Sequence, residues 1–432
     1  MNPKLAQELL RSKSGYSISE NSISHTCQLA CNLPCEDTFF TSQLPVLQDK
    51  SKDWCLWAVF DGHAGPRTAQ FLAEFMPFLL VATLLQTNCI ERPYQPNDFY
   101  VAQVIKRAFG KADEAIFSAA MEELQYHSGD LPQSINKMSP AISGSCALVS
   151  LFDPARSILR VANTGDSRAV LGRWDKQSGR YVAKPMSVDQ TGFNQDEVER
   201  LKREHRDEEP VDPKTGRVHG IAVTRTFGDS RWKWPQELSQ KVHDKFWGPT
   251  PRPDGMILTP PYLTAEPEIM ETEIQTGEKP DFLIMASDGL WDNMSSEDAV
   301  TCVQQWLDKY SPAEVVEAHS ISKRLRKKFR LWRDPEPETP LQTGEYDVNE
   351  DHDTYFDPEE KCLKWRVSPK HFIVEDDHCG MHLIKNALGG KRRNLFCGIL
   401  SVPPPLARNV RDDVTVHVIF FGVDFKAPKK SG

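Results

Sequence analysis

The sequence predicts an α+β fold in which two stacked, mostly antiparallel β-sheets carry helices on their outer faces. Short apolar runs of strand length come in pairs that turn residues separate, and helical segments flank these pairs. Three of the apolar runs have an aspartate at one end, which brings negative charge to the rim of a core. We therefore expect a sheet sandwich with an acidic site at one edge.

The predicted elements alternate between strands and helices along the chain. In order, we place a buried strand, two helices and three short strands at residues 54–60, 67–85, 98–125, 145–152, 158–163 and 168–172. Gly165 lies between the last two of these strands, so we expect a tight turn that joins them. A charged helix at 195–204, a polar flap at 206–220 and buried strands at 282–286 and 414–420 complete the pattern.

The aspartates beside the apolar strands are candidate metal ligands. Asp61 and Asp288 follow buried strands, and Asp412 precedes another. Carboxylates that gather at the edge of a core repel one another, and a bound metal ion usually relieves this repulsion. Because all of these ligand atoms are oxygens, Mg²⁺ or Mn²⁺ fits them better than zinc does.

The motifs around these aspartates resemble those of the metal-dependent serine/threonine protein phosphatases of type 2C. In the order typical of that family, the motifs are Glu36-Asp37, Asp61-Gly62-His63, 164–169, 225–229, 286–292 and 411–416. Segments 28–37, 260–268 and 382–387 are most similar to the pyruvate dehydrogenase phosphatase branch. The resemblance covers residues 25–423 and implies a four-layer αββα sandwich with a metal site at one edge.

The resemblance implies a site for two Mg²⁺ or Mn²⁺ ions. Asp61 would bridge the two ions, and Asp288 and Asp412 would complete the protein ligands of one of them. The carbonyl group of Gly62, with Glu36 acting through a water molecule, would hold the other ion. Two cations that share a carboxylate can lower the pKa of a bound water molecule and balance charge in a phosphoryl displacement.

A third, more weakly bound ion would take Asp166 and Asp292 as ligands, again by the resemblance. For Asp166 the alternative is a structural role, because an isolated Gly-Asp turn is more often structural. Glu36 alone would read as an ordinary surface acid, and its place in the Glu-Asp motif is what favours a role at the site.

We interpret Asp61 and His63 as the catalytic residues. His63 follows the bridging aspartate by two residues, where an imidazole can protonate the departing serine oxygen as a general acid. The alternative is a metal-binding or merely packed histidine. The sequence contains neither the Cys-x5-Arg loop of cysteine phosphatases nor the Asp-x-Asp start of haloacid-dehalogenase phosphatases, so we expect direct attack by metal-bound hydroxide.

Asn32 occupies the position, four residues before Glu36, at which many relatives carry a phosphate-binding arginine. The pyruvate dehydrogenase phosphatase branch is similar to this chain in having asparagine there. An amide offers a neutral donor without the charge and paired hydrogen bonds of a guanidinium group. We therefore expect position 32 to bind phosphate weakly, and protein contacts around the site to supply discrimination.

The resemblance implies a phosphatase for phosphoserine on the E1α subunit of pyruvate dehydrogenase in the mitochondrial matrix. The core of the dehydrogenase complex or a regulatory subunit would be a further partner. One alternative is a cytosolic or nuclear type 2C phosphatase that acts on signalling proteins, and another is an inactive scaffold. A calcineurin-type enzyme would need a Gly-Asn-His-Glu/Asp motif, which this sequence lacks.

Length alone suggests two or three domains for 432 residues. Because the expected metal ligands range from Glu36 to Asp412, the first and last strands must share one core, and we predict a single phosphatase domain at 23–424. Two segments interrupt this domain. One is a flap near 195–220, and the other is a charged insertion near 323–365, which is either a solvated segment or a docking surface. Residues 1–22 form an extension, either a targeting or disordered segment or a short helix, and 425–432 a tail.

The composition excludes several other classes of protein. A net charge of −9 disfavours nucleic-acid binding, and 10 cysteines without zinc-type spacing indicate free thiols in a reducing compartment. Cys27, Cys31 and Cys35 share parity, so we expect buried thiols on one side of a strand. The apolar run at 75–85 is too short to span a bilayer and reads as a buried helix, and we expect no membrane span.

Overall fold

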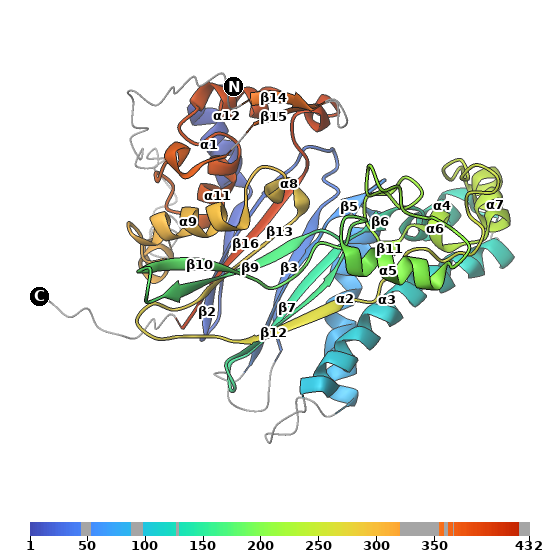
Figure 1. The fold of residues 1–432 in the computed structure, drawn as a ribbon, viewed down its shortest axis with the longest axis horizontal. Coiled ribbons are helices and arrows are strands. Elements are labelled where there is room, and N and C mark those ends of the chain that lie inside the picture. The colour runs from blue at the N-terminus through green and yellow to red at the C-terminus, as the bar shows by residue number, and fades with distance from the viewer. Residues whose placement is uncertain are drawn as a thin grey trace, which may run out of the picture.

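The computed structural model is a sandwich of two antiparallel sheets with helices on both outer faces (Figure 1). It describes residues 1–44, 53–87, 98–126, 129–319, 354–357, 362–365 and 367–422. Within these residues the first sheet runs β1-β2-β16-β13-β9-β10 and the second runs β12-β8-β7-β4-β3. The predicted α+β sandwich is confirmed.

The strands of the first sheet are Ser14–Ile18 (β1), Ser22–Leu29 (β2), Arg168–Asp175 (β9), Arg180–Pro185 (β10), Phe282–Ala286 (β13) and Val414–Phe421 (β16). Those of the second sheet are Thr38–Leu44 (β3), Trp54–Phe60 (β4), Ala147–Asp153 (β7), Ile158–Thr164 (β8) and Glu268–Glu273 (β12). A small third sheet joins Gly62–His63 (β5), Gly144–Ser145 (β6) and Phe227–Gly228 (β11).

Strands β4 and β13 are apolar at every position because both of their faces are buried. In β4, Leu56 and Ala58 point into the core beneath the helices, whereas Trp57 and Val59 point into the core between the two sheets. Side chains alternate between the two faces of a strand, so a strand covered on both sides reads as a continuous apolar run. This pattern is why β4 and β13 were recognisable in the sequence.

Helices cover the outer face of each sheet. On the second sheet lie Arg67–Gln86 (α2), Asp98–Tyr126 (α3) and Leu131–Ile142 (α4). On the first lie Pro3–Ser12 (α1), Ser296–Leu307 (α9), Cys379–Ala387 (α11) and Arg393–Ser401 (α12). Further helices are Gln195–Glu204 (α5), Ser230–Lys233 (α6), Gln236–Phe246 (α7), Asp288–Trp291 (α8), Pro369–His371 (η2) and Leu406–Asn409 (η3). Figure 1 shows α9 and α11 on one side of the sandwich and α2 and α3 on the other.

Helix α2 has the predicted start and ends one residue later than predicted, so it begins well before the apolar run at 75–85. Among the described residues it is the one helix that is long and apolar enough to cross a membrane by length and composition. However, Leu72, Met76 and Leu80 are buried in the core against the second sheet, and α3 and α4 pack beside them. We therefore interpret α2 as a core helix, because a core helix can meet the same criteria of length and composition as a membrane span.

The turn through Gly165 differs from our expectation. Strands β8 and β9 do not pair with each other: β8 pairs with β7 and β12, whereas β9 pairs with β10 and β13. The turn therefore carries the chain from the second sheet to the first. Gly165 has φ +109, and its N–H donates to Gln190 Oε1 at 2.7 Å, so its backbone is fixed by a contact outside the turn.

The N-terminal residues join the sandwich and do not form a separate extension. Helix α1 buries Ala6 and Leu10 completely, and β1 pairs with β2 at the edge of the first sheet. The three early cysteines also depart from our expectation, because only Cys27 lies in β2. Cys31 follows the end of that strand, buried as we predicted.

The flap and the charged insertion are described in part. Helix α5 has the predicted bounds, and the segment that follows it has only isolated bridges, such as the one between Val211 and Val218. Most of the insertion at 323–365 lies outside the described residues. Its C-terminal end forms a hairpin of Thr354–Asp357 (β14) and Cys362–Trp365 (β15), and the indole of Trp365 donates to the carbonyl of Ala387 at 2.8 Å.

Candidate metal centre

Three carboxylates from different parts of the fold meet at one end of the sandwich. Asp61 follows β4 of the second sheet, Asp288 begins α8 directly after β13 of the first, and Asp166 lies in the turn between the sheets. One oxygen from each side chain lies within 4.8 Å of the others. The backbone N–H of Asp288 donates to Asp61 Oδ2 at 3.3 Å, which links the two sheets at this point.

The environment of this cluster opposes negative charge. Burial raises the pKa of Asp61 and of Asp288 well above the usual range, and neighbouring aspartates raise both further. Burial also raises the pKa of Asp166. A divalent cation would remove this mutual repulsion, and a donor set made only of carboxylate and carbonyl oxygens fits hard ions such as Mg²⁺ or Mn²⁺. The residues present therefore fit a metal centre.

The cluster opens into a cavity of about 830 Å³. Asp292 and Asp412 line this cavity together with the three clustered aspartates. Neither belongs to the tight group of three carboxylates that Asp61, Asp166 and Asp288 form.

Glu36 and Gly62 are held together at the same end of the sheets. A Cβ atom on Gly62 would lie 2.3 Å from the carbonyl oxygen of Glu36, so this close approach requires glycine. The carboxylate of Glu36 accepts from the N–H of Gly65 at 2.6 Å, and burial raises its pKa. Glu36 is thus an oriented, half-buried acid and not an ordinary surface residue.

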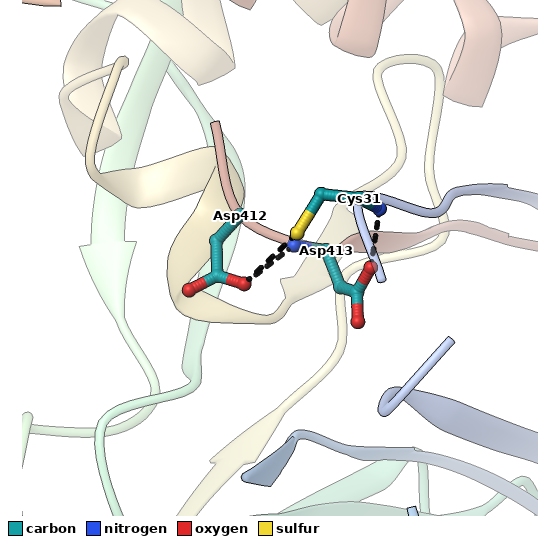
Figure 2. A group of neighbouring side chains, drawn as sticks. All are labelled: Cys31, Asp412 and Asp413. Carbon is teal, nitrogen blue, oxygen red and sulfur yellow. Dashed lines mark hydrogen bonds between the residues drawn. The ribbon is translucent and has the colours of Figure 1, made fainter. Parts of the chain in front are cut away.

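Cys31, Asp412 and Asp413 form a second group of potential ligands, which Figure 2 shows. Asp413 already accepts hydrogen bonds from the N–H groups of Cys31, Asn32 and Glu36 and from the side chain of Asn32. Burial raises the pKa of the Cys31 thiol, which donates to Asp412 Oδ1 at 3.5 Å. Because the Cys31 thiol is protonated and the Asp413 carboxylate is saturated with donors, these two residues order the loop. Asp412 is the member of this group that stays a candidate metal ligand.

His63 pairs with an acid to which we had assigned no role. Its Nε2 lies 2.7 Å from Oδ2 of Asp229, and the histidine side chain is 30% exposed while the aspartate is 1% exposed. Burial alone would lower the pKa of His63, but the charge of Asp229 and this hydrogen bond outweigh it, so the pKa is raised. Asp229 ends the motif at 225–229, and this motif was the signal in the sequence that pointed to it.

Asn32 and Arg408 lie beside Glu36. The amide nitrogen of Asn32 donates to Glu36 Oε2 at 3.0 Å and to Asp413 Oδ2 at 3.1 Å. Arg408, in η3, reaches Glu36 Oε2 at 3.3 Å and Asp412 Oδ2 at 3.1 Å. Sequence reasoning missed Arg408. Its only local signal is the spacing of four residues from Asp412, which is common among surface charges.

Comparisons with known proteins show the family of this chain. The family model "Protein phosphatase 2C" matches residues 24–330. A protein phosphatase 2C homolog from Schizosaccharomyces pombe is 36% identical over 402 residues, which cover 91% of this chain and 79% of that protein. Mitochondrial [pyruvate dehydrogenase [acetyl-transferring]]-phosphatase 1 from Saccharomyces cerevisiae is 33% identical, with 91% of this chain and 68% of that protein covered. The human protein of the same name is 28% identical, with coverages of 91% and 76%.

A solved structure shares the fold. The crystal structure of serine-threonine phosphatase 2C from Toxoplasma gondii superimposes with a TM-score of 0.52 at 14% identity, covering 94% of this chain and 99% of that one. The sandwich and its acidic edge thus define the class, a metal-dependent phosphatase. The chain belongs to the protein phosphatase 2C family and is a protein serine/threonine phosphatase.

Proposed function

We propose that this phosphatase uses two Mg²⁺ or Mn²⁺ ions to hydrolyse phosphoserine, and that a third ion binds more weakly. Asp61 and the carbonyl of Gly62 would hold the ions with Asp288, Asp412 and, through water, Glu36. Asp166 and Asp292 are assigned to the weaker ion. The observation that carries the proposal is the buried carboxylate cluster, whose repulsion calls for cations. When bound, such ions activate water and balance the charge of the phosphate.

His63 protonates the departing serine oxygen in this proposal. An alkoxide is a poor leaving group, so a proton donor at its oxygen lowers the barrier. Asp229 supports this role, because its charge stabilises the imidazolium form of His63 and its hydrogen bond fixes the ring at the wall of the cavity. His63 is therefore protonated and correctly oriented before the substrate binds.

The proposed substrate is phosphoserine on the E1α subunit of pyruvate dehydrogenase, in the mitochondrial matrix. Its support is the similarity to mitochondrial phosphatases named for that enzyme, which extends over 91% of the chain. The core of the dehydrogenase complex or a regulatory subunit is a further proposed partner. The second candidate is a cytosolic or nuclear phosphatase for signalling proteins, for which the Schizosaccharomyces pombe relative leaves room because its name specifies neither substrate nor compartment.

A comparison of substrates tests this proposal. The protein in Mn²⁺ should release phosphate from phosphorylated E1α within the intact complex with a much higher kcat/KM than from short generic phosphoserine peptides, and EDTA should stop both reactions. Similar kcat/KM values on the complex and on the peptides would favour the signalling phosphatase. Hydrolysis that continues in EDTA would contradict the metal assignment. Imaging of the tagged full chain then separates matrix from cytosol and nucleus.

A further inference from the structure

We infer that Arg408 is the residue that binds the substrate phosphate in this chain. This inference rests on the proposed function, because it assumes that a phosphoserine phosphate approaches the carboxylate cluster. The structural observation is the guanidinium group itself. Its Nη1 reaches Glu36 at 3.3 Å, its Nη2 reaches Asp412 at 3.1 Å, and the side chain is half exposed at the wall of the cavity.

Asn32 has no donor left for a phosphate. Its side-chain amide has two hydrogens, and the nitrogen that carries them already donates to Glu36 at 3.0 Å and to Asp413 at 3.1 Å. We had expected this amide to serve as a weak neutral donor to the substrate. The contacts instead assign it to the loop, where it holds Glu36 against Asp413.

The other arginines of the cavity are less suited to the phosphate. Arg411 is 9% exposed, and its guanidinium donates to the carbonyls of Ile399 and Ala30, so it ties the chain together beneath the site. Arg217 lies on the flap and donates to the carbonyl of Gly220. Arg231 stacks on the ring of Trp232. Arg408 is the arginine of this cavity whose ion pairs reach the proposed metal ligands.

Its position suits a phosphate that approaches the metal ligands. Glu36 and Asp412 are the carboxylates that we assign to different ions, and the guanidinium lies within reach of both. A guanidinium has five N–H donors, and the described contacts use two of its nitrogens with one acceptor each. Further N–H groups are therefore available to the paired oxygens of a phosphate, for which a planar guanidinium is well matched.

A direct binding experiment tests the inference with Arg408→Ala, Arg408→Lys and, as the matched control, Arg217→Ala. The control removes the same charge from the same cavity without touching the carboxylates. The affinity for inorganic phosphate is measured by titration calorimetry at saturating Mn²⁺. The affinity for Mn²⁺ is measured separately from the electron paramagnetic resonance signal of the free ion.

We expect Arg408→Ala to weaken phosphate binding by about 10–100-fold, the effect of one or two charge-assisted hydrogen bonds, with Mn²⁺ affinity within about threefold of the parent. The phosphate affinity of Arg408→Lys should lie between those of the parent and of Arg408→Ala, since lysine keeps the charge without the paired donors. Arg217→Ala should bind phosphate like the parent. Millimolar guanidinium should restore part of the phosphoserine hydrolysis that Arg408→Ala loses.

Two results would overturn the inference. Phosphate affinity in Arg408→Ala that matches Arg217→Ala would show that the guanidinium does not contact phosphate. An equal loss of phosphate and Mn²⁺ affinity would show that it only orders Glu36 and Asp412. The proposed function is judged separately: a parent protein that fails to hydrolyse phosphoserine in Mn²⁺ contradicts that proposal, whatever the phosphate affinities are.

Discussion

Replacing Asp229 with asparagine should slow phosphoserine hydrolysis and make the reaction more sensitive to alkali. The change is nearly isosteric, and asparagine tolerates the left-handed backbone of this position, where φ is 55°. The backbone contacts of residue 229 with Ser143 and Trp232 do not involve its side chain and should persist. The perturbation is thus confined to the charge beside His63.

The magnitude follows from the 2.7 Å contact between His63 and Asp229. A hydrogen bond to a charged partner contributes about 1.5–3 kcal/mol, which corresponds to a loss of about 10–150-fold in kcat. Asp229 raises the pKa of His63, so its neutralisation must lower that pKa. A general acid works in its protonated form, and the alkaline limb of the kcat profile should therefore move to lower pH in Asp229→Asn.

The assay measures kcat against pH on a phosphoserine peptide and on p-nitrophenyl phosphate. His63→Gln should lose about 10²–10⁴-fold on the peptide and lose the alkaline limb, whereas Asp229→Asn should keep a shifted limb. Both variants should hydrolyse p-nitrophenyl phosphate nearly as well as the parent, because its phenolate leaves without a proton. Equal losses on the two substrates, or an unmoved alkaline limb in Asp229→Asn, would refute the assignment of His63 as the acid.

Three further predictions concern the metal ligands and the scaffold. Asp61→Asn or Asp288→Asn should abolish Mn²⁺-dependent turnover yet raise the unfolding temperature of the metal-free protein, because each removes a repelling buried charge; a lower temperature in differential scanning calorimetry would contradict this. Glu197→Gln should cost about 3 kcal/mol in urea unfolding at pH 7. Despite burial, Arg225 and other partners lower the pKa of Glu197 from 4.5 to about 2, so the cost should shrink as pH falls below about 5, and a pH-independent cost would argue against the pair. Gly62→Ala should lower the free energy of unfolding in urea by about 1–3 kcal/mol and reduce activity, since the new Cβ would lie 2.3 Å from the Glu36 carbonyl oxygen. Stability and activity equal to those of the parent would contradict this prediction.

Much of the fold was predicted from patterns within single segments of the sequence. The runs at 54–60 and 282–286 are apolar at every position, and only a strand covered on both faces needs this, so they predicted the centre of a sandwich. The charged helix at 195–204 was predicted with its observed bounds, and the structure shows that Asn194 caps it and that its acidic and basic residues suit its two ends. Asp61, Asp288 and Asp412 lie beside strand ends and line one cavity, and their role as metal ligands stays a prediction.

The sequence by itself determined the class of fold, the family motifs and the acidic character of the site, because these depend on residue type and on spacing within single elements. Only the tertiary structure decided which of these residues meet. The turn at Gly165 resembled a hairpin because its two strands are close in sequence, yet their pairing depends on β7 and β13. Arg408 reaches Glu36 across 372 positions of the chain, and no local period encodes such a contact. The two sheets pack face to face with helices on their outer faces, and this packing brings these distant residues together at one edge.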